Sequence, residues 1–337
     1  QEPAKRRKML EAAITRFRAG FDKLKIQRTP ALLPVGMLLR LGDFYLRFIG
    51  ALGDLFMETA DAKLLDEQIL ASNSAVDAYS SAKRTARVAE AIWCRARIRS
   101  KKGEHMAAAQ DYGESAENFR NATSSMPSLA SLYLDLEKYL QAWMKIEEAR
   151  AAHGGARYRE ASETYRRASS ILKDTQRWSP LSEHYDACAL FEGAEAVSHE
   201  ENPELAAKAF GEAALGFATS KQAISTWQTT GEEEVREREH WDLVTAARER
   251  YCQARAILEE AKHLDRKGEH DLSSRRFASA TAILESLSEE EETTEGKLEM
   301  RTLALFSQAW GLMKEAEARR RAETYEAAAQ MFEKVAE

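Results

Sequence analysis

Four of the seven histidines fall at or beside expected helix turns, where imidazole nitrogens can bind a metal ion or respond to pH. They are His105, His153, His199 and His270. Stacked hairpins would place these side chains along one edge. Neighbouring helices pack about 10 Å apart, however, which is too wide for one ion to collect ligands from several hairpins. A histidine near a helix C-terminus also interacts well with the helix dipole, so the pattern favours a structural role.

The three cysteines, Cys94, Cys188 and Cys252, do not form a pattern typical of chemistry. They lie far apart in apolar helical segments, without a CxxC pair or an adjacent histidine, so we interpret them as small core residues. The sequence also contains no P-loop, Gly-rich dinucleotide turn, HExxH motif or Gly-x-Ser-x-Gly elbow. We therefore predict a non-catalytic protein without a cofactor or metal ion, in a reducing, cytoplasmic compartment.

A basic cluster opens the chain, at the start of an amphipathic helix expected over residues 3–25. It consists of Lys5, Arg6, Arg7 and Lys8. Such a cluster can bind an anionic surface or RNA, but a solvated first helical turn is the commoner explanation. The formal net charge of -6 and the pI near 5.8 argue against a protein whose main partner is nucleic acid.

The composition favours a globular, all-helical chain. Hydrophobic residues make up 44% and charged residues 31% of the 337 positions, which excludes a disordered chain. Only 6 prolines and 16 glycines interrupt a sequence rich in Ala, Glu, Arg and Leu, which are good helix formers.

One set of small and aromatic residues recurs five times at fixed spacing. A small residue is followed twelve positions later by another, then four later by an aromatic and three later by a small residue. The five ladder sets are Ala96, Ala108, Tyr112, Ser115; Ala149, Ala161, Tyr165, Ala168; Ala194, Ala206, Phe210, Ala213; Ala261, Ser273, Phe277, Ala280; and Ala309, Arg321, Tyr325, Ala328, with Arg321 as a misfit. Small side chains let antiparallel helices approach closely. We therefore predict repeated helical hairpins and name the first residue of each set its inner alanine.

The most apolar segment, residues 32–57, carries its charges along one helical edge: Arg40, Asp43, Arg47 and Asp54. A membrane-spanning helix would have to place these charges in hydrocarbon, so we predict no transmembrane segment. A helix that packs against the first hairpin is the favoured interpretation. A homo-oligomer or partner interface, or a membrane-surface helix, is the alternative. We accordingly divide the chain into an N-terminal helical segment, 1–58, and a repeat domain, 59–337.

Turn signals place several helix ends. Residues 60–102 predict one long helix or two with a soft break near 71–74, followed by a turn at 101–105 in which Gly103 is left-handed. Asn202 followed by Pro203 predicts a capped helix start. Residues 232–267 predict another long helix.

The ladder sets resemble the tetratricopeptide repeat, whose two helices pack through small, small, aromatic and small residues at these intervals. The resemblance covers about residues 79–337. Aromatic residues recur after 53, 45, 67 and 48 positions, which exceeds the ~34 residues of a regular repeat. The resemblance implies an all-α, right-handed α-solenoid of about five antiparallel hairpins with unusually long helices, preceded by the apolar N-terminal region.

In this family the first helix of each repeat lines an inner groove. The resemblance therefore implies that the residue after each inner alanine, and the residue four further on, point into that groove. They include Arg97, Lys101, Arg150, Lys262, Arg266, Trp310 and Lys314. Such a groove suits an acidic peptide or a terminal carboxylate, although the family's Lys and Asn clamp is not matched. The alternative is that these cations pair with Glu104, Glu147 or Glu269 and bind nothing.

We predict a helical-repeat scaffold that binds a protein or acidic peptide partner through this groove. The alternative function is a nucleic-acid-binding or membrane-surface adaptor that uses the basic N-terminus and the groove; with Trp310 as the one aromatic in the row, nucleic acid is disfavoured. The chain begins at Gln1 and stops within a helical pattern at Glu337, so we expect a fragment of a larger protein.

Overall fold

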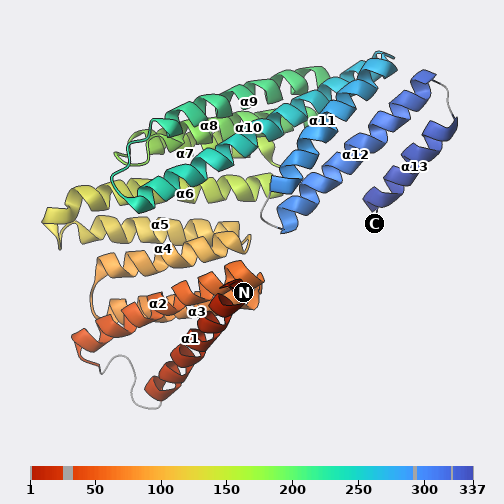
Figure 1. Ribbon diagram of the computed structural model, residues 1–337. Helices are drawn as coiled ribbons and strands as arrows, with labels where there is room; N and C mark the ends of the chain where they lie inside the picture. The colour runs from red at the N-terminus through yellow and green to blue at the C-terminus, as the bar shows by residue number, and fades with distance from the viewer. Residues whose placement is uncertain (1, 26–32, 291–293, 320–321, 337) are drawn as a thin grey trace. The chain divides into compact units, whose positions relative to one another are not determined.

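The computed structural model describes residues 2–25, 33–290, 294–319 and 322–336, and within these ranges every regular element is helical (Figure 1). This confirms the predicted all-α class. The helices pack against their neighbours in chain order, as in a solenoid. Arg321 of the last ladder set lies outside the described residues.

Packing divides the chain into two compact units. Unit 1 comprises residues 1–151 and 174–177, and unit 2 comprises residues 152–173 and 178–337. The predicted boundary at residue 58 concerns where the repeats begin, and it stays a prediction.

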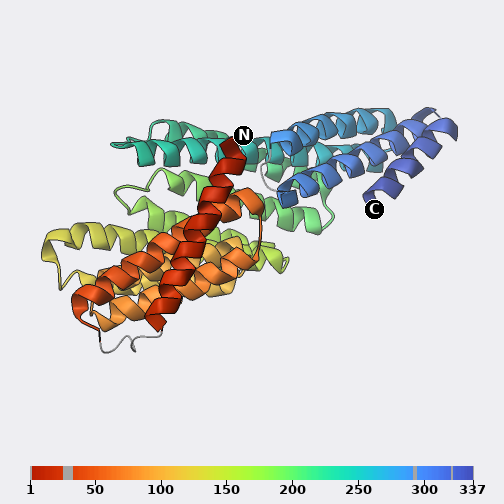
Figure 2. The same ribbon diagram turned by 60° about the horizontal axis from the view of Figure 1, so that its bottom comes forward.

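Unit 1 is a row of antiparallel helices with α1 laid across it (Figure 2). Its helices are α1 (Glu2–Lys25), α2 (Val35–Thr59), α3 (Lys63–Ser81), α4 (Thr85–Lys101), α5 (His105–Ala122), the 3-10 turn η2 (Pro127–Leu129) and α6 (Ala130–Gly154), whose last three residues belong to unit 2. Each of α1 to α4 packs on the next helix. The rings of Tyr112 and Trp143, 5.8 Å apart, join α5 to α6.

The apolar helix α2 buries its hydrophobic face inside unit 1. Leu38, Phe48 and Leu52 are buried there, because α1 and α3 cover this face. Gly42 lies against the ring of Tyr79, so closely that an added methyl group would fall 2.5 Å from the ring carbons. In the described ranges no helix combines the length and apolarity needed to cross a bilayer.

The charged edge of α2 faces outward, as its spacing predicts. Arg40, Arg47 and Asp54 are exposed, and Asp43 accepts a hydrogen bond of 2.6 Å from the Tyr79 hydroxyl. The charged edge of α2 therefore remains accessible, together with Val35, Met37 and Met57 near the two ends of the helix. A homo-oligomer through residues 32–57 stays a prediction.

Left-handed residues end the helices of successive hairpins. Gly103 (φ 74°) and Gly268 (φ 79°) follow α4 and α10, and the first of them confirms the predicted cap. Lys83, Ala156 and Glu201 take the same conformation, with φ between 54° and 58°, after α3, α6 and α8. At this turn the left-handed position is occupied by Lys83 rather than by glycine, so the sequence gives no glycine signal for it. The break within residues 60–102 consequently lies at 82–84 rather than near 71–74.

Unit 2 is also built from sequential helices, whose lengths range from 15 residues in α13 to 35 in α10. They are α7 (Tyr158–Lys173), α8 (Leu181–His199), α9 (Pro203–Ser225), α10 (Glu232–Arg266), α11 (His270–Glu290), α12 (Thr294–Arg319) and α13 (Ala322–Ala336). Asn202 caps α9 by accepting a hydrogen bond from the Leu205 amide at 3.3 Å, which confirms the predicted start.

The ladder residues form the packing seams of both units. Every residue of the first four ladder sets is buried, with at most 7% of its surface exposed. In the last set Ala309 and Ala328 are buried, but the aromatic residue Tyr325 is 44% exposed. The ladder is therefore structural, and functional side chains must be sought beside it.

Candidate binding site on helix α4

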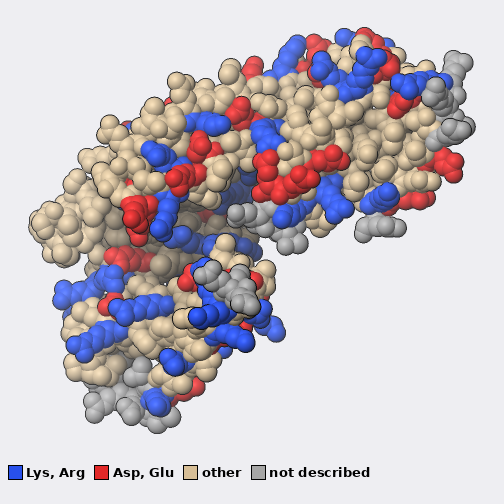
Figure 3. Space-filling view, viewed as in Figure 1, with Lys and Arg blue, Asp and Glu red and all other residues tan. Residues whose placement is uncertain are grey.

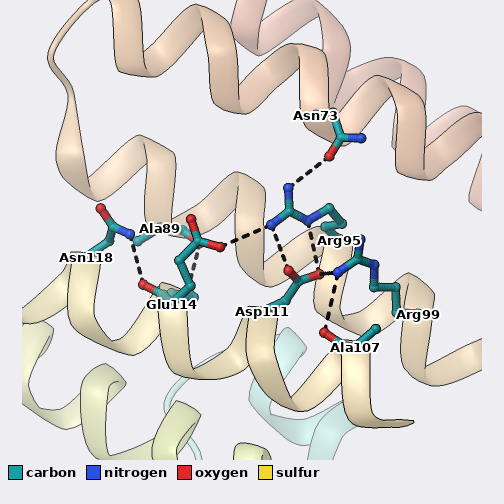
Figure 4. Close-up of polar contacts among 9 residues, drawn as sticks. Asn73, Ala89, Arg95, Arg99, Ala107, Asp111, Glu114 and Asn118 are labelled. Carbon is teal, nitrogen blue, oxygen red and sulfur yellow. Dashed lines mark hydrogen bonds and ion pairs between the residues drawn. The ribbon is translucent and has the colours of Figure 1, made fainter. Parts of the chain in front are cut away.

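Helix α4 carries a run of basic residues at every second position, and alternate members point to opposite faces. Arg95 and Arg99 turn toward α5, where both bind the buried carboxylate of Asp111 (Figure 4). The Arg95 guanidinium donates to Asp111 at 3.0 and 2.7 Å, and Arg99 lies 2.9 Å from the same carboxylate. Arg95 also donates to Asn73 at 2.8 Å and to Glu114 at 3.2 Å. These two arginines therefore serve the structure of unit 1.

Arg97 and Lys101 lie on the other face of α4 and are exposed. Among the described residues neither side chain forms an ion pair or hydrogen bond. They are four residues apart on one helix, so the two positive charges are neighbours. Partial desolvation, together with the charge of Arg97, lowers the pKa of Lys101. An anion bound at this face would relieve that repulsion.

A difference in the sequence explains why Arg97 has no carboxylate partner. Three ladder sets carry a buried glutamate two positions before the inner alanine: Glu147, Glu192 and Glu259. Arg150 binds Glu147 at 2.8 Å and Lys262 binds Glu259 at 2.6 Å, each cation lying three residues beyond its carboxylate. The corresponding position before Arg97 is Cys94. The set that begins at Ala96 therefore lacks the neutralising group.

The neighbourhood of Arg97 also holds a fixed cation, Arg150. The Glu147 carboxylate accepts hydrogen bonds of 2.8 Å from Ser100, His105 and Arg150, which fixes Arg150 beside α4. The guanidinium of Arg150 also lies 5.7 Å from the centre of the Trp143 ring.

The buried residue Tyr112 lies within electrostatic range of both arginines. Burial raises the pKa of its phenol, and the charges of Arg97 and Arg150 act in the opposite direction. Its hydroxyl forms no hydrogen bond with another described residue. Arg97, Lys101 and Arg150 thus bring three cations together, while Tyr112, 2% exposed, belongs to the packing seam.

The other predicted groove residues belong to unit 2, and the structure assigns each an internal contact. Arg266 donates to the carbonyl of Glu201 at 2.6 Å, while Lys262 pairs with Glu259 as described. Lys314 is buried and contacts Asp265 at 2.9 Å and Glu317 at 3.0 Å. Its ammonium also lies 5.2 Å from the centre of the Trp310 ring.

Trp310 itself is half-buried between Phe306 and Phe332, with ring centres 6.1 and 5.7 Å away. Of the predicted pairing partners, Glu147 is confirmed for Arg150. In unit 2 the partners are instead Glu259, Asp265 and Glu317.

Three of the four histidines near the helix turns form contacts with carboxylates. His105, His153 and His270 each contact a carboxylate, so no shared edge of free imidazoles exists among them. Ligand atoms of Asp265, His270 and Glu317 lie within 4.8 Å of one another, but the Lys314 ammonium already contacts both carboxylates there.

The cysteines lie in environments that disfavour the thiolate. Burial raises the pKa of Cys94 and raises that of Cys252 to about 12. Cys252 is buried, as its interpretation as a core residue predicts, whereas Cys94 and Cys188 are half-buried.

The strongest signal missed in the sequence is an asymmetry of charge. Residues 1–102 contain 20 Lys and Arg against 11 Asp and Glu, a net charge of +9, whereas the rest of the chain carries 29 against 44, a net charge of -15. Figure 3 shows Lys and Arg gathered over the part of unit 1 that contains α1 and α2. Within the basic N-terminal cluster, Arg6 pairs with Glu58 at 3.2 Å and Arg7 with Glu11 at 2.9 Å.

Comparison with protein-family models, with curated proteins and with solved structures gives no match to this chain. The tetratricopeptide resemblance therefore rests on the ladder residues alone, and the function must be argued from the side chains.

Proposed function

We propose that this chain is a non-catalytic, tetratricopeptide-like scaffold that binds an acidic segment of a partner protein on helix α4. The observation that carries the proposal is the pair of exposed, uncompensated cations Arg97 and Lys101. Elsewhere in the predicted groove, Arg150, Lys262 and Lys314 are neutralised by nearby carboxylates. A cytoplasmic location belongs to the same proposal.

The donor set suits carboxylates. A guanidinium binds a carboxylate through two parallel hydrogen bonds, and an ammonium adds a point charge one helical turn away. Arg97 and Lys101 are therefore matched to two acidic side chains of one peptide. The net charge of -6 disfavours a nucleic-acid strand as the main ligand.

The test uses a fluorescein-labelled decaglutamate peptide and measures its anisotropy at low and physiological salt. We expect binding that weakens at least tenfold in the double variant Arg97→Glu, Lys101→Glu, because each charge-assisted hydrogen bond contributes about 1.5–3 kcal/mol. The matched control is Lys83→Glu, Arg84→Glu, which changes the net charge of unit 1 equally at the other end of α4.

Equal loss in both double variants would indicate general charge attraction and overturn the proposal. Equally tight binding of an oligonucleotide of the same net charge, weakened to the same extent by the Arg97 and Lys101 substitutions, would overturn the assignment of an acidic peptide as the ligand. A labelled decaglutamine peptide controls for contacts that need no charge.

A further inference from the structure

Five helix ends meet at one end of unit 1. Because α2 to α6 run alternately up and down, the starts of α2, α4 and α6 lie at the same end as the finishes of α3 and α5 (Figures 1 and 2). We name residues 33–40, 78–88 and 119–134 the tip face. All of them belong to unit 1.

The tip face contains no acidic residue. Its charged side chains are Arg40, Lys83, Arg84, Arg87 and Arg120. Arg87 pairs with Asp43 and Glu90, and Arg120 pairs with Glu137.

The other three cations, Arg40, Lys83 and Arg84, are exposed and form no ion pair with a described residue. The absence of carboxylates is unusual in a chain where Asp and Glu outnumber Lys and Arg by 55 to 49. The unpaired charges of the tip face are therefore all positive, while the exposed carboxylates Asp77 and Glu117 and the half-buried Asp135 lie at its margins.

The same face exposes large apolar side chains. Six of them are between 36% and 51% exposed: Val35, Met37, Met126, Leu129, Leu132 and Leu134. Residues 121–134 contain no charge at all, and the corresponding edge of the molecule in Figure 3 shows neither basic nor acidic side chains.

The connection between α5 and α6 is held in place by its own contacts. The rings of Phe119 and Tyr133 lie 5.7 Å apart, and the Tyr133 hydroxyl lies 3.6 Å from the sulfur of Met126. Met126, Leu129, Leu132 and Leu134 are consequently presented by an ordered turn rather than by a loose loop.

We propose that the tip face docks on the surface of an anionic phospholipid bilayer. Lys83, Arg84 and Arg40 would pair with lipid phosphates, while the apolar tips enter the boundary between headgroups and acyl chains. The apolar groups stand on separate turns rather than in one groove. A soft bilayer interface accommodates such separate tips, whereas a folded protein partner would need one continuous complementary surface.

This contact is peripheral and separate from the peptide site. In the described ranges no helix can span a membrane. Arg84 and Lys101 lie at opposite ends of α4, about 25 Å apart at 1.5 Å per residue. The two proposals can therefore fail independently.

The test is flotation of the full chain with vesicles of phosphatidylcholine, with and without phosphatidylserine. We expect flotation only with phosphatidylserine. Each Lys or Arg near an anionic surface strengthens binding about fivefold, so Lys83→Glu, Arg84→Glu should weaken it at least tenfold. The peptide-site variant Arg97→Glu, Lys101→Glu, with the same change of net charge, should float like the wild type.

A second pair of variants tests insertion. Leu129→Ser with Leu132→Ser should lose the part of flotation that survives high salt, whereas Leu215→Ser with Leu243→Ser, two exposed leucines of unit 2, should retain it. No flotation with phosphatidylserine would overturn the proposal. Equal behaviour of the tip-face and control variants in either pair would do the same.

Discussion

Asp111 is the carboxylate on which the interface between α4 and α5 depends. Its side chain is 3% exposed and lies within 3.0 Å of donors from both Arg95 and Arg99. A buried charge of this kind is tolerated only because charged donors surround it.

Replacing Asp111 with alanine should lower the free energy of unfolding by about 2–3 kcal/mol, because two arginines lose their shared partner in a partly buried site. Arg95 keeps Asn73 and Glu114, which limits the loss. Urea unfolding followed by circular dichroism measures the change. The control is Asp77→Ala, an exposed aspartate at the end of α3, with an expected change below about 0.5 kcal/mol. Similar losses in the two variants would contradict the assignment.

His153 should make stability depend on pH. Its hydrogen bond to Glu192, 3.0 Å long, raises the pKa of the imidazole, and Glu195 acts in the same direction against Arg248 and partial burial. The folded state therefore holds the proton more tightly than the unfolded chain. The resulting stabilisation is full below the unfolded pKa near 6.5 and is lost as pH rises through the raised folded pKa.

Unfolding of the wild type and His153→Gln at pH 5.8 and pH 8.5 tests this sign. The difference in the free energy of unfolding between the two proteins should be larger at pH 5.8. His240→Gln, on an exposed part of α10, is the matched histidine control. A difference that grows toward pH 8.5 would refute the expected sign.

At this scale the sequence places residues better than it assigns their partners. The offset from the inner alanine selects Arg97 and Lys101, and both are exposed. The pairs Arg150 with Glu147 and Lys262 with Glu259 are three residues apart and can be read from a helical wheel. The contact of His105 with Glu147 spans 42 residues, so its register depends on helix lengths that vary between hairpins.

At the scale of the helix, the contribution of a ladder residue to stability depends on how many neighbouring helices cover it. Phe210 of α9 is fully buried between α8 and α10, whereas Tyr325 of α13 occupies the same ladder position and is 44% exposed. The difference arises because α9 packs between two helices, while α12 is the one extensive partner of α13 among the described residues.

Phe210→Ala should therefore lower the free energy of unfolding by about 3–5 kcal/mol, the usual cost of removing a buried phenylalanine. Tyr325→Ala should cost less than about 1 kcal/mol. Differential scanning calorimetry of the two variants compares one ladder position at two levels of burial. Comparable losses would show that α13 is covered on both sides in solution.

Helix boundaries follow local signals where those signals exist. Gly103 and Asn202 give correct helix ends because glycine and a capping side chain act on their own backbone. The turn at Lys83 has no such marker, and its left-handed lysine is held by backbone hydrogen bonds from the Lys83 amide to the Ser80 carbonyl (2.9 Å) and from the Arg84 amide to the Tyr79 carbonyl (3.0 Å). The predicted break was misplaced there for that reason.

At the scale of the molecule, most packing is between helices adjacent in the chain. In the described ranges the extensive contacts join consecutive helices, and α8 with α10 is a minor exception. Stability in such an arrangement is close to a sum of local and nearest-neighbour contributions. A perturbation should therefore spread over a few helices only.

Amide hydrogen exchange of Phe119→Ala tests this locality. Phe119 of α5 is 1% exposed and packs against Tyr133 of α6, so the cavity should raise exchange in α4, α5 and α6. Helices α10 to α12 follow four or more helices after α6 in the chain and should keep their protection. The reciprocal variant Phe277→Ala, buried in α11, should leave α4 and α5 protected. Uniform loss of protection in either variant would mean that the helices unfold as one cooperative body, because only all-or-none opening carries a local cavity to distant amides.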